Sequence, residues 1–570
     1  MRYYALATDY DGTLATEGRV DEATLAALER LRNSGRRLIL VTGRELDELL
    51  QVFPQVDLFE SVVAENGALL YRPATREIKL LAEAPPARFA ETLRARGVGP
   101  LSVGRVIVAT WTPHETAVLE TIRELGLELQ VIFNKGAVMV LPSGVNKATG
   151  LAAALEALGL SPHNTVGVGD AENDHAFLHL CEASVAVANA LPSLKEQADW
   201  VTQGSRGAGV TELIDHLLAA DLADLEPRLT RHEVPLGRRE GEETVQLKPY
   251  GVSVLLAGTS GGGKSTLATG FLERLSEKGY QFCIIDPEGD YQNLEGAVVL
   301  GTPQRAPTVA EAIQLIEAPD QNVAINLLGI TMEDRPAYFE GLLTAVMELR
   351  ARTGRPHWIV IDETHHLLPA AWAPALLTVP KELQGFLLIT VHPDRISRAV
   401  LASIDLIIAI GSNPEETIRT FSETLGEPAP SVPPVSLEPG EAIAWWRRPK
   451  SEPFWFRSIP PRGERLRHLR KYAEGELGAD KSFYFRGPEG KLNLRAQNLT
   501  LFLQLADGVD NETWMHHLRQ GDYSRWFREA IKDDPLADEA AQIEAARDLS
   551  AEESRARIRE RIEARYTHPA

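Results

Sequence analysis

Asp-Tyr-Asp-Gly-Thr-Leu, residues 9–14, follows directly on an apolar stretch, Tyr3 to Thr8, that has the character of a buried β-strand. Gly12 allows a tight turn immediately after the two aspartates. Carboxylates at the carboxyl end of a buried strand lie where open α/β sheets bind their ligands. This stretch therefore predicts an α/β fold with a polar site at the end of its first strand.

Three further segments end or begin in polar residues in the same way. They are the strand Arg37 to Val41 followed by Thr42-Gly43-Arg44, the helix start Val145-Asn146-Lys147, and the strand Val166 to Val168 followed by Gly169 to Asp174. Apolar strands that alternate with helical stretches over residues 1–217 are typical of an α/β sheet.

These residue types suit the transfer of a phosphoryl group. Asp9 can attack phosphorus in line, and Asp11 can protonate the leaving oxygen and later activate water. Thr42 and Lys147 can bind the transferring oxygens and offset their charge. The expected Mg²⁺ ligands and their supports are the carboxylates of Asp9 and Asp170, the main-chain carbonyl of Asp11, and the side chains of Asp174 and Asn173.

The four segments, in this order, resemble the haloacid dehalogenase superfamily over about residues 1–217. Ala64 to Ala68 and Gly144 to Gly150 are similar to its Cof-type branch, which implies a Rossmann-like domain with an α/β cap at about residues 70–142. Each aspartate alone could be an ordinary turn or cap residue, but the four motifs together favour a Mg²⁺-dependent phosphatase of a phosphorylated small molecule. The cap's basic residues suit such a substrate or a solvated surface; they are Arg72, Arg76, Lys79, Arg88, Arg94, Arg96 and Arg105.

A second phosphate-handling motif occurs in the middle of the chain. Gly258 to Thr266 has the pattern G-x-x-x-x-G-K-S, between the apolar strand Val252 to Ala257 and a helix that begins at Ser265. Lys264 would reach the β- and γ-phosphates of ATP, and Ser265 would bind Mg²⁺. The expected nucleotide-binding residues are Gly258, Thr259, Ser260, Gly261, Gly262, Gly263, Lys264, Ser265 and Thr266.

A strand at Trp358 to Ile361 ends in Asp362-Glu363, where Asp362 would hold the metal's water shell and Glu363 would polarise the attacking water. With Val-Pro-Leu-Gly in the lead-in and Asp286 to Tyr291, this set resembles the HerA- and FtsK-like ATPases over about residues 233–460. That resemblance implies a homo-oligomeric ring in which Arg395 or Arg398 reaches a neighbouring subunit; a surface arginine is an equally good interpretation of either.

These patterns predict four parts: a hydrolase domain (1–220), a linker and lead-in (221–250), a P-loop α/β domain (251–460) and a small, mainly helical C-terminal region (461–570). The net charge of −21 argues against a surface that coats DNA broadly, and two cysteines in apolar surroundings argue against disulfides. No apolar run reaches the length of a membrane span, so we expect a cytoplasmic protein with no membrane partner.

We expect a phosphatase fused to an ATP-hydrolysing domain, with Mg²⁺ and ATP as the small-molecule partners. Two alternatives stay open. One is a ring-forming DNA translocase that uses the phosphatase domain as an effector, which would make nucleic acid a partner. The other is a kinase and phosphatase that processes nucleic-acid ends; the 98 positions between Lys264 and Asp362, and an Asp-Glu pair suited to activating water, weigh against it.

Overall fold

The structure is a computed structural model. It describes residues 1–241, 243–259, 262–292, 294–370, 384–432, 435–448, 451–462, 482–531, 533–546 and 548–566. The chain divides into two compact units, Met1–Ile459 and Pro460–Ala570. In the part of the chain that is described, no helix is long and apolar enough to cross a membrane.

The N-terminal sheet positions the first group of motifs. Its order is β12 (Trp200–Val201), β11 (Ala183–Ala186), β10 (Thr165–Gly169), β1 (Ala5–Thr8), β2 (Arg37–Val41), β3 (Ser61–Ala64), β4 (Leu69–Arg72) and β5 (Glu77–Leu80). The strands from β12 to β3 are parallel, so the segments that follow β1, β2 and β10 meet at one edge. This brings three of the four sequence motifs together.

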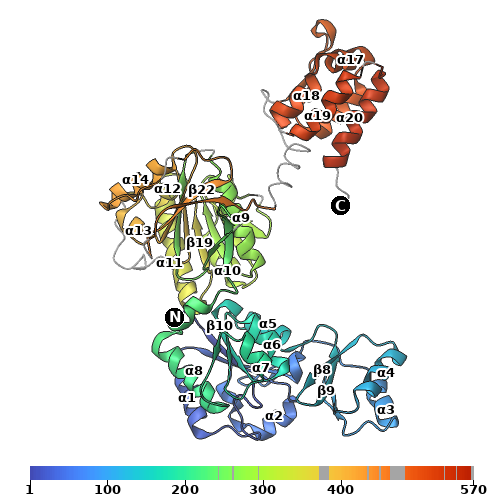
Figure 1. The fold of residues 1–570 in the computed structure, drawn as a ribbon, viewed down its shortest axis with the longest axis vertical. Coiled ribbons are helices and arrows are strands. Elements are labelled where there is room, and N and C mark those ends of the chain that lie inside the picture. Colours follow the sequence, from blue (N-terminus) through green and yellow to red (C-terminus); the bar gives the residue numbers. More distant parts are fainter. Residues whose placement is uncertain are drawn as a thin grey trace. The chain divides into compact units, whose positions relative to one another are not determined.

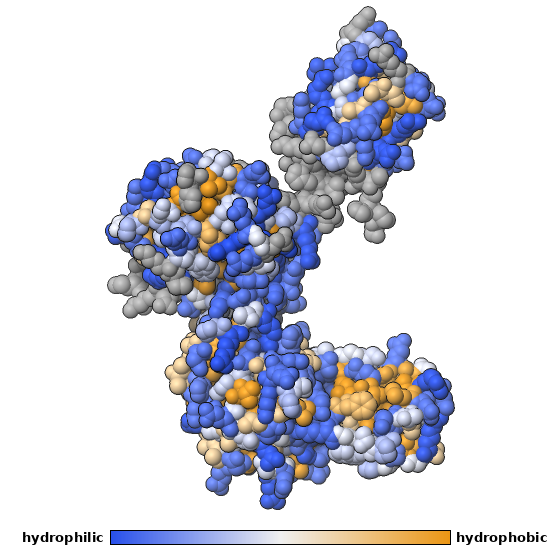
Figure 2. All heavy atoms as spheres, viewed as in Figure 1, coloured by the Kyte–Doolittle hydropathy of each residue, from blue (hydrophilic) through white to orange (hydrophobic). Residues whose placement is uncertain are grey.

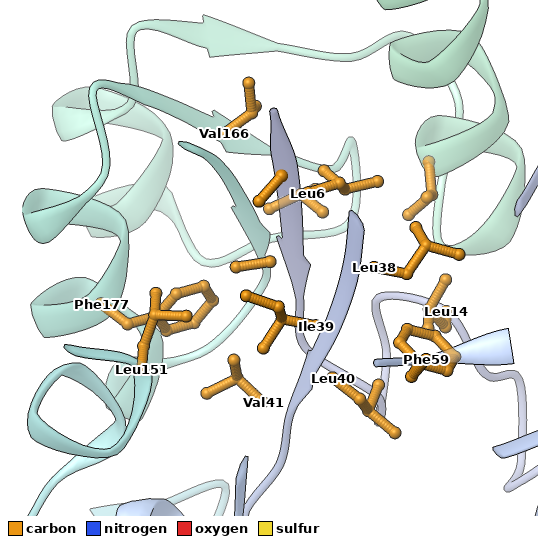
Figure 3. Close-up of a cluster of buried hydrophobic side chains, with 14 of the residues drawn as sticks. Leu6, Leu14, Leu38, Ile39, Leu40, Val41, Phe59, Leu151, Val166 and Phe177 are labelled. Atoms are coloured by element: carbon orange, nitrogen blue, oxygen red, sulfur yellow. The ribbon is translucent and has the colours of Figure 1, made fainter. Parts of the chain in front are cut away.

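Helices cover both faces of this sheet (Figure 1). They are α1 (Glu22–Asn33), α2 (Leu46–Val52), α5 (Lys147–Ala157), α6 (His175–Leu180), α7 (Pro192–Gln197) and α8 (Gly207–Ala220). Because neighbouring residues of a strand point to opposite faces, Ile39 and Val41 lie on the side of Leu151 and Phe177, whereas Leu38 and Leu40 lie on the other side (Figure 3). A continuous buried strand of this kind is typical of a parallel sheet with both faces covered.

The cap has its own antiparallel sheet. Its order is β6 (Ser102–Val103), β7 (Val108–Trp111), β9 (Ala137–Pro142) and β8 (Leu129–Asn134), packed with α3 (Ala87–Ala95) and α4 (Glu115–Leu125). The sequence places the cap's start near residue 70, but β4 and β5 pair with the main sheet. The local sequence pattern does not show which strands pair with one another. Because β4 and β5 belong to the main sheet, we propose that the cap starts after Leu80.

The central part of the chain forms a second, larger sheet. Its order is β14 (Thr244–Leu247), β13 (Val234–Arg238), β23 (Phe454–Ser458), β22 (Glu441–Trp446), β21 (Leu406–Ile410), β15 (Ser253–Gly258), β20 (Phe386–Thr390), β19 (Trp358–Ile361), β16 (Phe282–Asp286), β18 (Asn322–Asn326) and β17 (Ala297–Leu300). The strands from β21 to β17 are parallel. The helices around them are α9 (Lys264–Glu277), α10 (Val309–Glu317), α11 (Arg335–Thr353), α12 (Thr364–Leu367), α13 (Arg398–Ala402) and α14 (Pro414–Leu425).

The second unit is small and mainly helical, with a core rich in aromatic side chains. Its hairpin of β24 (Phe483–Phe485) and β25 (Leu494–Ala496) precedes α16 (Leu499–Gly508), α17 (Asn511–Gln520), α18 (Asp522–Trp526), α19 (Asp534–Ala545) and α20 (Ala551–Tyr566). The predicted fold class is thus confirmed: a Rossmann-like α/β domain with an α/β cap, a P-loop α/β domain and a small, mainly helical C-terminal region.

Candidate functional site

The nucleophile candidate, Asp9, lies directly after β1 and is only 4% exposed. Its main-chain N–H donates to the carbonyl of Val168 on β10 (3.0 Å), which fixes the strand end beside the next motif. Lys147 begins α5, after the N-cap Asn146, and its Nζ donates to Asp9 Oδ1 (2.5 Å) and to Asp174 Oδ1 (2.6 Å). One buried lysine therefore joins two of the motifs predicted from sequence.

Burial sets the electrostatics of this group. Burial and the nearby Asp174 raise the pKa of Asp9 to about 7, against the opposing effect of Lys147. Burial alone would lower the pKa of Lys147, but the carboxylates of Asp174 and Asp9 outweigh it and raise that pKa. The lysine is therefore a fixed positive charge, placed where the negative charge of a phosphoryl group would be bound.

Asp170 and Asp174 differ in the hydrogen bonds that their carboxylate oxygens accept from the protein. Asp174 Oδ2 accepts hydrogen bonds from the N–H groups of Asp170 (2.8 Å) and Ala171 (2.9 Å), while its Oδ1 accepts from Lys147. Burial raises the pKa of Asp170, and its Oδ2 accepts a hydrogen bond from the ammonium of Lys135 (2.8 Å). Asp9, Asp170 and Asp174 each bring a carboxylate oxygen within 4.8 Å of the others. We therefore propose Asp9 and Asp170 as metal ligands and Asp174 as the support that orients Lys147 and the loop.

Arg44 is a member of the site to which the sequence pattern assigned no role. Its guanidinium holds both oxygens of Asp11 (2.6 and 2.7 Å), a bidentate pair that fixes the side chain expected to act as acid and base. Its main-chain N–H donates to the hydroxyl of the fully buried Thr42 (3.1 Å). Within the described residues, the buried Nδ2 of Asn66 and Oδ1 of Asn173 have no hydrogen-bond partner, so these two polar atoms are left for a ligand or water.

A cavity of about 430 Å³ lies between this edge of the sheet and the cap. Its core side is lined by Asp9, Asp11, Gly43, Arg44, Glu45, Glu48, Lys147 and Asn173. Its cap side is lined by Pro100, Ser102, Ile107, Ala109, Thr110, Trp111, Asn134, Lys135, Ala137 and Met139. None of the seven basic residues that the sequence singles out for the cap lines it. Figure 2 shows apolar residues gathered on the visible face of the cap. Two apolar side chains of the cap, Trp111 and Phe133, are about half exposed.

The phosphate loop follows β15, as its motif predicts. Gly258 (φ +156°) and Gly263 (φ +97°) bound the loop, and a Cβ on Gly258 would lie 2.2 Å from the carbonyl oxygen of Ile410. Lys264 Nζ donates to the carbonyls of Gly258 (3.1 Å) and Thr259 (3.2 Å), so the lysine folds back across the loop. Two of the predicted nucleotide-binding residues, Ser260 and Gly261, lie outside the described residues.

The acidic pair Asp362-Glu363 follows β19, and the adjacent strand β20 lies between it and β15. Burial raises the pKa of Asp362 to about 7 and also raises that of Glu363. Glu363 has a left-handed backbone (φ +40°), a strained conformation that is frequent at functional sites. His365 Nδ1 lies 3.3 Å from the Glu363 carboxylate and 3.2 Å from Oγ1 of Thr390, the residue that ends β20. His365 therefore links Glu363 to β20, the strand next to β15, which the phosphate loop follows.

The two arginines proposed from sequence for a neighbouring subunit differ in the structure. Arg398 donates to the carbonyl of Leu425 (2.6 Å) at the end of α14 and contributes to packing within the domain. Arg395, which is exposed as Arg398 also is, lies in a short helical turn that follows His392 after β20. Of the two, Arg395 is therefore better placed to reach another molecule.

Another buried polar group occurs away from both sites, formed by His163, Glu182 and His232. The Glu182 carboxylate accepts hydrogen bonds from Arg2 (2.7 Å), His163 (2.8 Å) and Tyr280 (3.1 Å). Burial would raise the pKa of Glu182, but His163 and Arg2 lower it to about 2. The chain's own donors therefore satisfy this carboxylate, and we interpret the group as a structural polar contact.

Comparison with known proteins agrees with this geometry. Residues 6–93 and 112–214 match the haloacid dehalogenase-like hydrolase family, and residues 247–346 match the central domain of helicase HerA. A phosphoglycolate phosphatase of Methanothermobacter thermautotrophicus is 32% identical over 37% of this chain and 96% of its own length. One from Halorubrum lacusprofundi is 33% identical over 39% and 97%. A solved haloacid dehalogenase-like hydrolase from Bacteroides thetaiotaomicron is 18% identical over 38% of this chain and 99% of that chain, with a TM-score of 0.34.

The match to the hydrolase family covers the Asp9, Thr42, Lys147 and Asp170 motifs, and the HerA match begins ahead of the phosphate loop. The phosphatase and the P-loop ATPase that the motifs predict are therefore both confirmed at the level of family. The chain belongs, through its N-terminal domain, to the haloacid dehalogenase-like hydrolases and carries a HerA-type ATPase domain after it.

Proposed function

We propose that the N-terminal domain hydrolyses a small phosphate monoester through a phospho-aspartate at Asp9. The observation that carries this is the buried contact of Lys147 with both Asp9 and Asp174, at the floor of the cavity. Asp9 Oδ would attack phosphorus as the ester oxygen leaves with its electron pair, and Asp11 would give that oxygen a proton. Water, deprotonated by Asp11, would then attack phosphorus and release phosphate and free Asp9.

The residues present fit Mg²⁺. Two carboxylates (Asp9 and Asp170) and one main-chain carbonyl (Asp11) form the hard-oxygen donor set that this ion prefers. The ammonium of Lys135 already lies on two of these oxygens, at 2.8 Å from Asp170 Oδ2 and 3.2 Å from the Asp11 carbonyl, which marks the position as one that attracts a cation. When bound there, Mg²⁺ would neutralise charge on the phosphoryl oxygens.

The leaving group that we propose carries a carboxylate, as phosphoglycolate does. The curated relatives are named phosphoglycolate phosphatases. Among the described residues, Arg44 and Lys135 line the cavity as cations besides Lys147, together with the carboxylates of Glu45 and Glu48, of which Glu48 pairs with Arg44. The volume of about 430 Å³ also admits a larger leaving group, and the apolar cap side could hold it.

The purified full-length chain should release phosphate from 2-phosphoglycolate in the presence of Mg²⁺, and excess EDTA should reduce the rate to background. A panel of sugar phosphates and p-nitrophenyl phosphate, measured under the same conditions, ranks the alternatives by kcat/KM. Phosphate release that continues in EDTA would contradict the metal assignment, and no turnover of any monoester would contradict the phosphatase assignment.

For the central domain we propose ATP hydrolysis at the phosphate loop, with Glu363 as the group that activates water and with Ser265 and Asp362 on the Mg²⁺ side. We keep the predicted boundaries at residues 220, 250 and 460 as proposals, and a cytoplasmic location likewise. A DNA-stimulated ATPase rate would favour the translocase version of this function and would make nucleic acid a partner.

A ring is the assembly that we propose for this domain. The exposed Arg395 after β20 would complete the ATP site of a neighbouring subunit, because an arginine supplied from outside can stabilise the charge that develops during hydrolysis. We expect an Arg395→Ala protein to bind ATP but to hydrolyse it about 10³-fold or more slowly. An Arg352→Ala protein, changed at an exposed arginine of α11, is the matched control.

The decisive measurement mixes two inactive proteins. Arg395→Ala and Lys264→Ala chains should regain ATPase activity together, since each supplies the group that the other lacks, and light scattering with ATP and Mg²⁺ should show a homo-oligomer. A monomeric protein with full ATPase activity would contradict the ring.

A further inference from the structure

Lys135 is a cap residue whose side chain contacts the proposed metal-binding residues. It lies in the turn between β8 and β9, where Lys135 (φ +47°) and Gly136 (φ +87°) both have left-handed backbones. This turn directs the side chain out of the cap, so that its Nζ lies 2.8 Å from Asp170 Oδ2 and 3.2 Å from the Asp11 carbonyl oxygen. A cation carried by the cap thus contacts two of the three oxygen groups that we assign to the metal.

The ammonium and a divalent ion cannot share these oxygens. Mg²⁺ binds oxygen at about 2.0–2.1 Å, and a unit charge held within a few ångströms of it would be strongly repelled at the low effective dielectric of a half-buried site. Asp170 is 3% exposed and held by its loop, whereas the Lys135 side chain is 45% exposed. The lysine is therefore the partner that moves.

The other cations of the cavity are already committed. Lys147 is buried between Asp9 and Asp174, and Arg44 holds both oxygens of Asp11. Lys135 is thus the least constrained of the three cations that line the cavity in the described part of the chain. Once separated from Asp170, it remains next to the space in which a leaving group would sit.

We propose that Lys135 exchanges between Asp170, which it neutralises before the metal binds, and the anionic leaving group of the substrate once the metal is in place. This role rests on the phosphatase function proposed above. It makes Lys135 both a competitor of the metal and the cap residue that selects a negatively charged leaving group.

The first test measures metal affinity rather than activity. Mn²⁺ binding to the full-length chain, followed by electron paramagnetic resonance of the free ion, is compared for wild type and Lys135→Met. Loss of a competing ion pair should make the variant bind Mn²⁺ roughly three- to tenfold more tightly. Lys79→Met, which removes an exposed lysine from β5, should leave the affinity unchanged. Equal affinity in wild type and Lys135→Met, or weaker binding by the variant, overturns the proposal.

The second test separates selectivity from general damage. Lys135→Met should lower the ratio of kcat/KM for 2-phosphoglycolate to kcat/KM for p-nitrophenyl phosphate, whose leaving group has no carboxylate, by roughly tenfold. An equal change for both substrates contradicts the selective role. If the wild type hydrolyses neither ester, the proposed function fails, and the Mn²⁺ comparison still decides whether Lys135 competes for the site.

Discussion

Asp9→Asn should abolish phosphate release from every monoester that the wild-type chain hydrolyses. The amide lacks the nucleophilic oxygen charge, and removal of a catalytic nucleophile in an unrelated hydrolase costs on the order of 10⁶-fold in kcat. The measurement is the single-turnover rate with the best substrate of the panel. The fold should survive, because Lys147 keeps its contact with Asp174 and one buried carboxylate is no longer charged.

Two controls make this result specific. Asp57→Asn changes an exposed aspartate of the same domain and should be indistinguishable from wild type. ATP binding by the Asp9→Asn chain should also be unchanged, since the phosphate loop is built on another sheet. Phosphatase turnover by the Asp9 variant at a rate close to that of wild type would contradict the assignment of the nucleophile.

The parts of the phosphatase site that could be predicted from sequence share one physical origin. Asp9, Thr42 and Asp170 each follow a short apolar strand, and parallel strands bring their carboxyl ends to the same edge. Lys147 could be predicted because it begins a helix after an Asn that caps it. In such cases the local pattern fixes both the element and the end of it on which the side chain lies.

Arg44 and Lys135 could not be assigned in this way. Arg44 stands in the quoted motif Thr42-Gly43-Arg44, yet its pairing with Asp11 depends on the spacing of β1 and β2, which no local pattern contains. Lys135 depends on the turn of a cap hairpin and on the closeness of the cap to Asp170. The cap's more numerous arginines attracted attention because of their charge alone, and a charge count does not say which face of a sheet a residue occupies.

The ATPase site shows the same division. The phosphate loop and Asp362-Glu363 follow strands with clear apolar patterns, whereas the roles of Arg395 and Arg398 depend on distant contacts. Arg398 is held by the carbonyl of Leu425, 27 positions further along the chain. That contact separates two arginines that the sequence alone treats as equivalent.

Glu363→Gln should leave ATP binding intact and slow its hydrolysis by roughly 10²–10⁴-fold, the range for loss of a general base. The glutamine keeps the size of the side chain but cannot accept a proton from water. Burial raises the pKa of this carboxylate, its backbone is left-handed, and it lies 3.3 Å from His365 Nδ1, so a partly buried carboxylate stands where a general base is needed. The measurement is ATP turnover beside the dissociation constant of a fluorescent ATP analogue.

Lys264→Ala should behave in the opposite way and weaken binding itself, because its ammonium is the charge in the loop that would contact the phosphates. Glu348→Gln, at an exposed glutamate of α11, is the neutral control. Lys264→Ala and Glu363→Gln together therefore distinguish a residue that binds the triphosphate from one that activates the attacking water. If Glu363→Gln hydrolysed ATP as fast as wild type, the base would lie elsewhere, and phosphoryl transfer to a nucleic-acid hydroxyl would again be the better interpretation of the central domain.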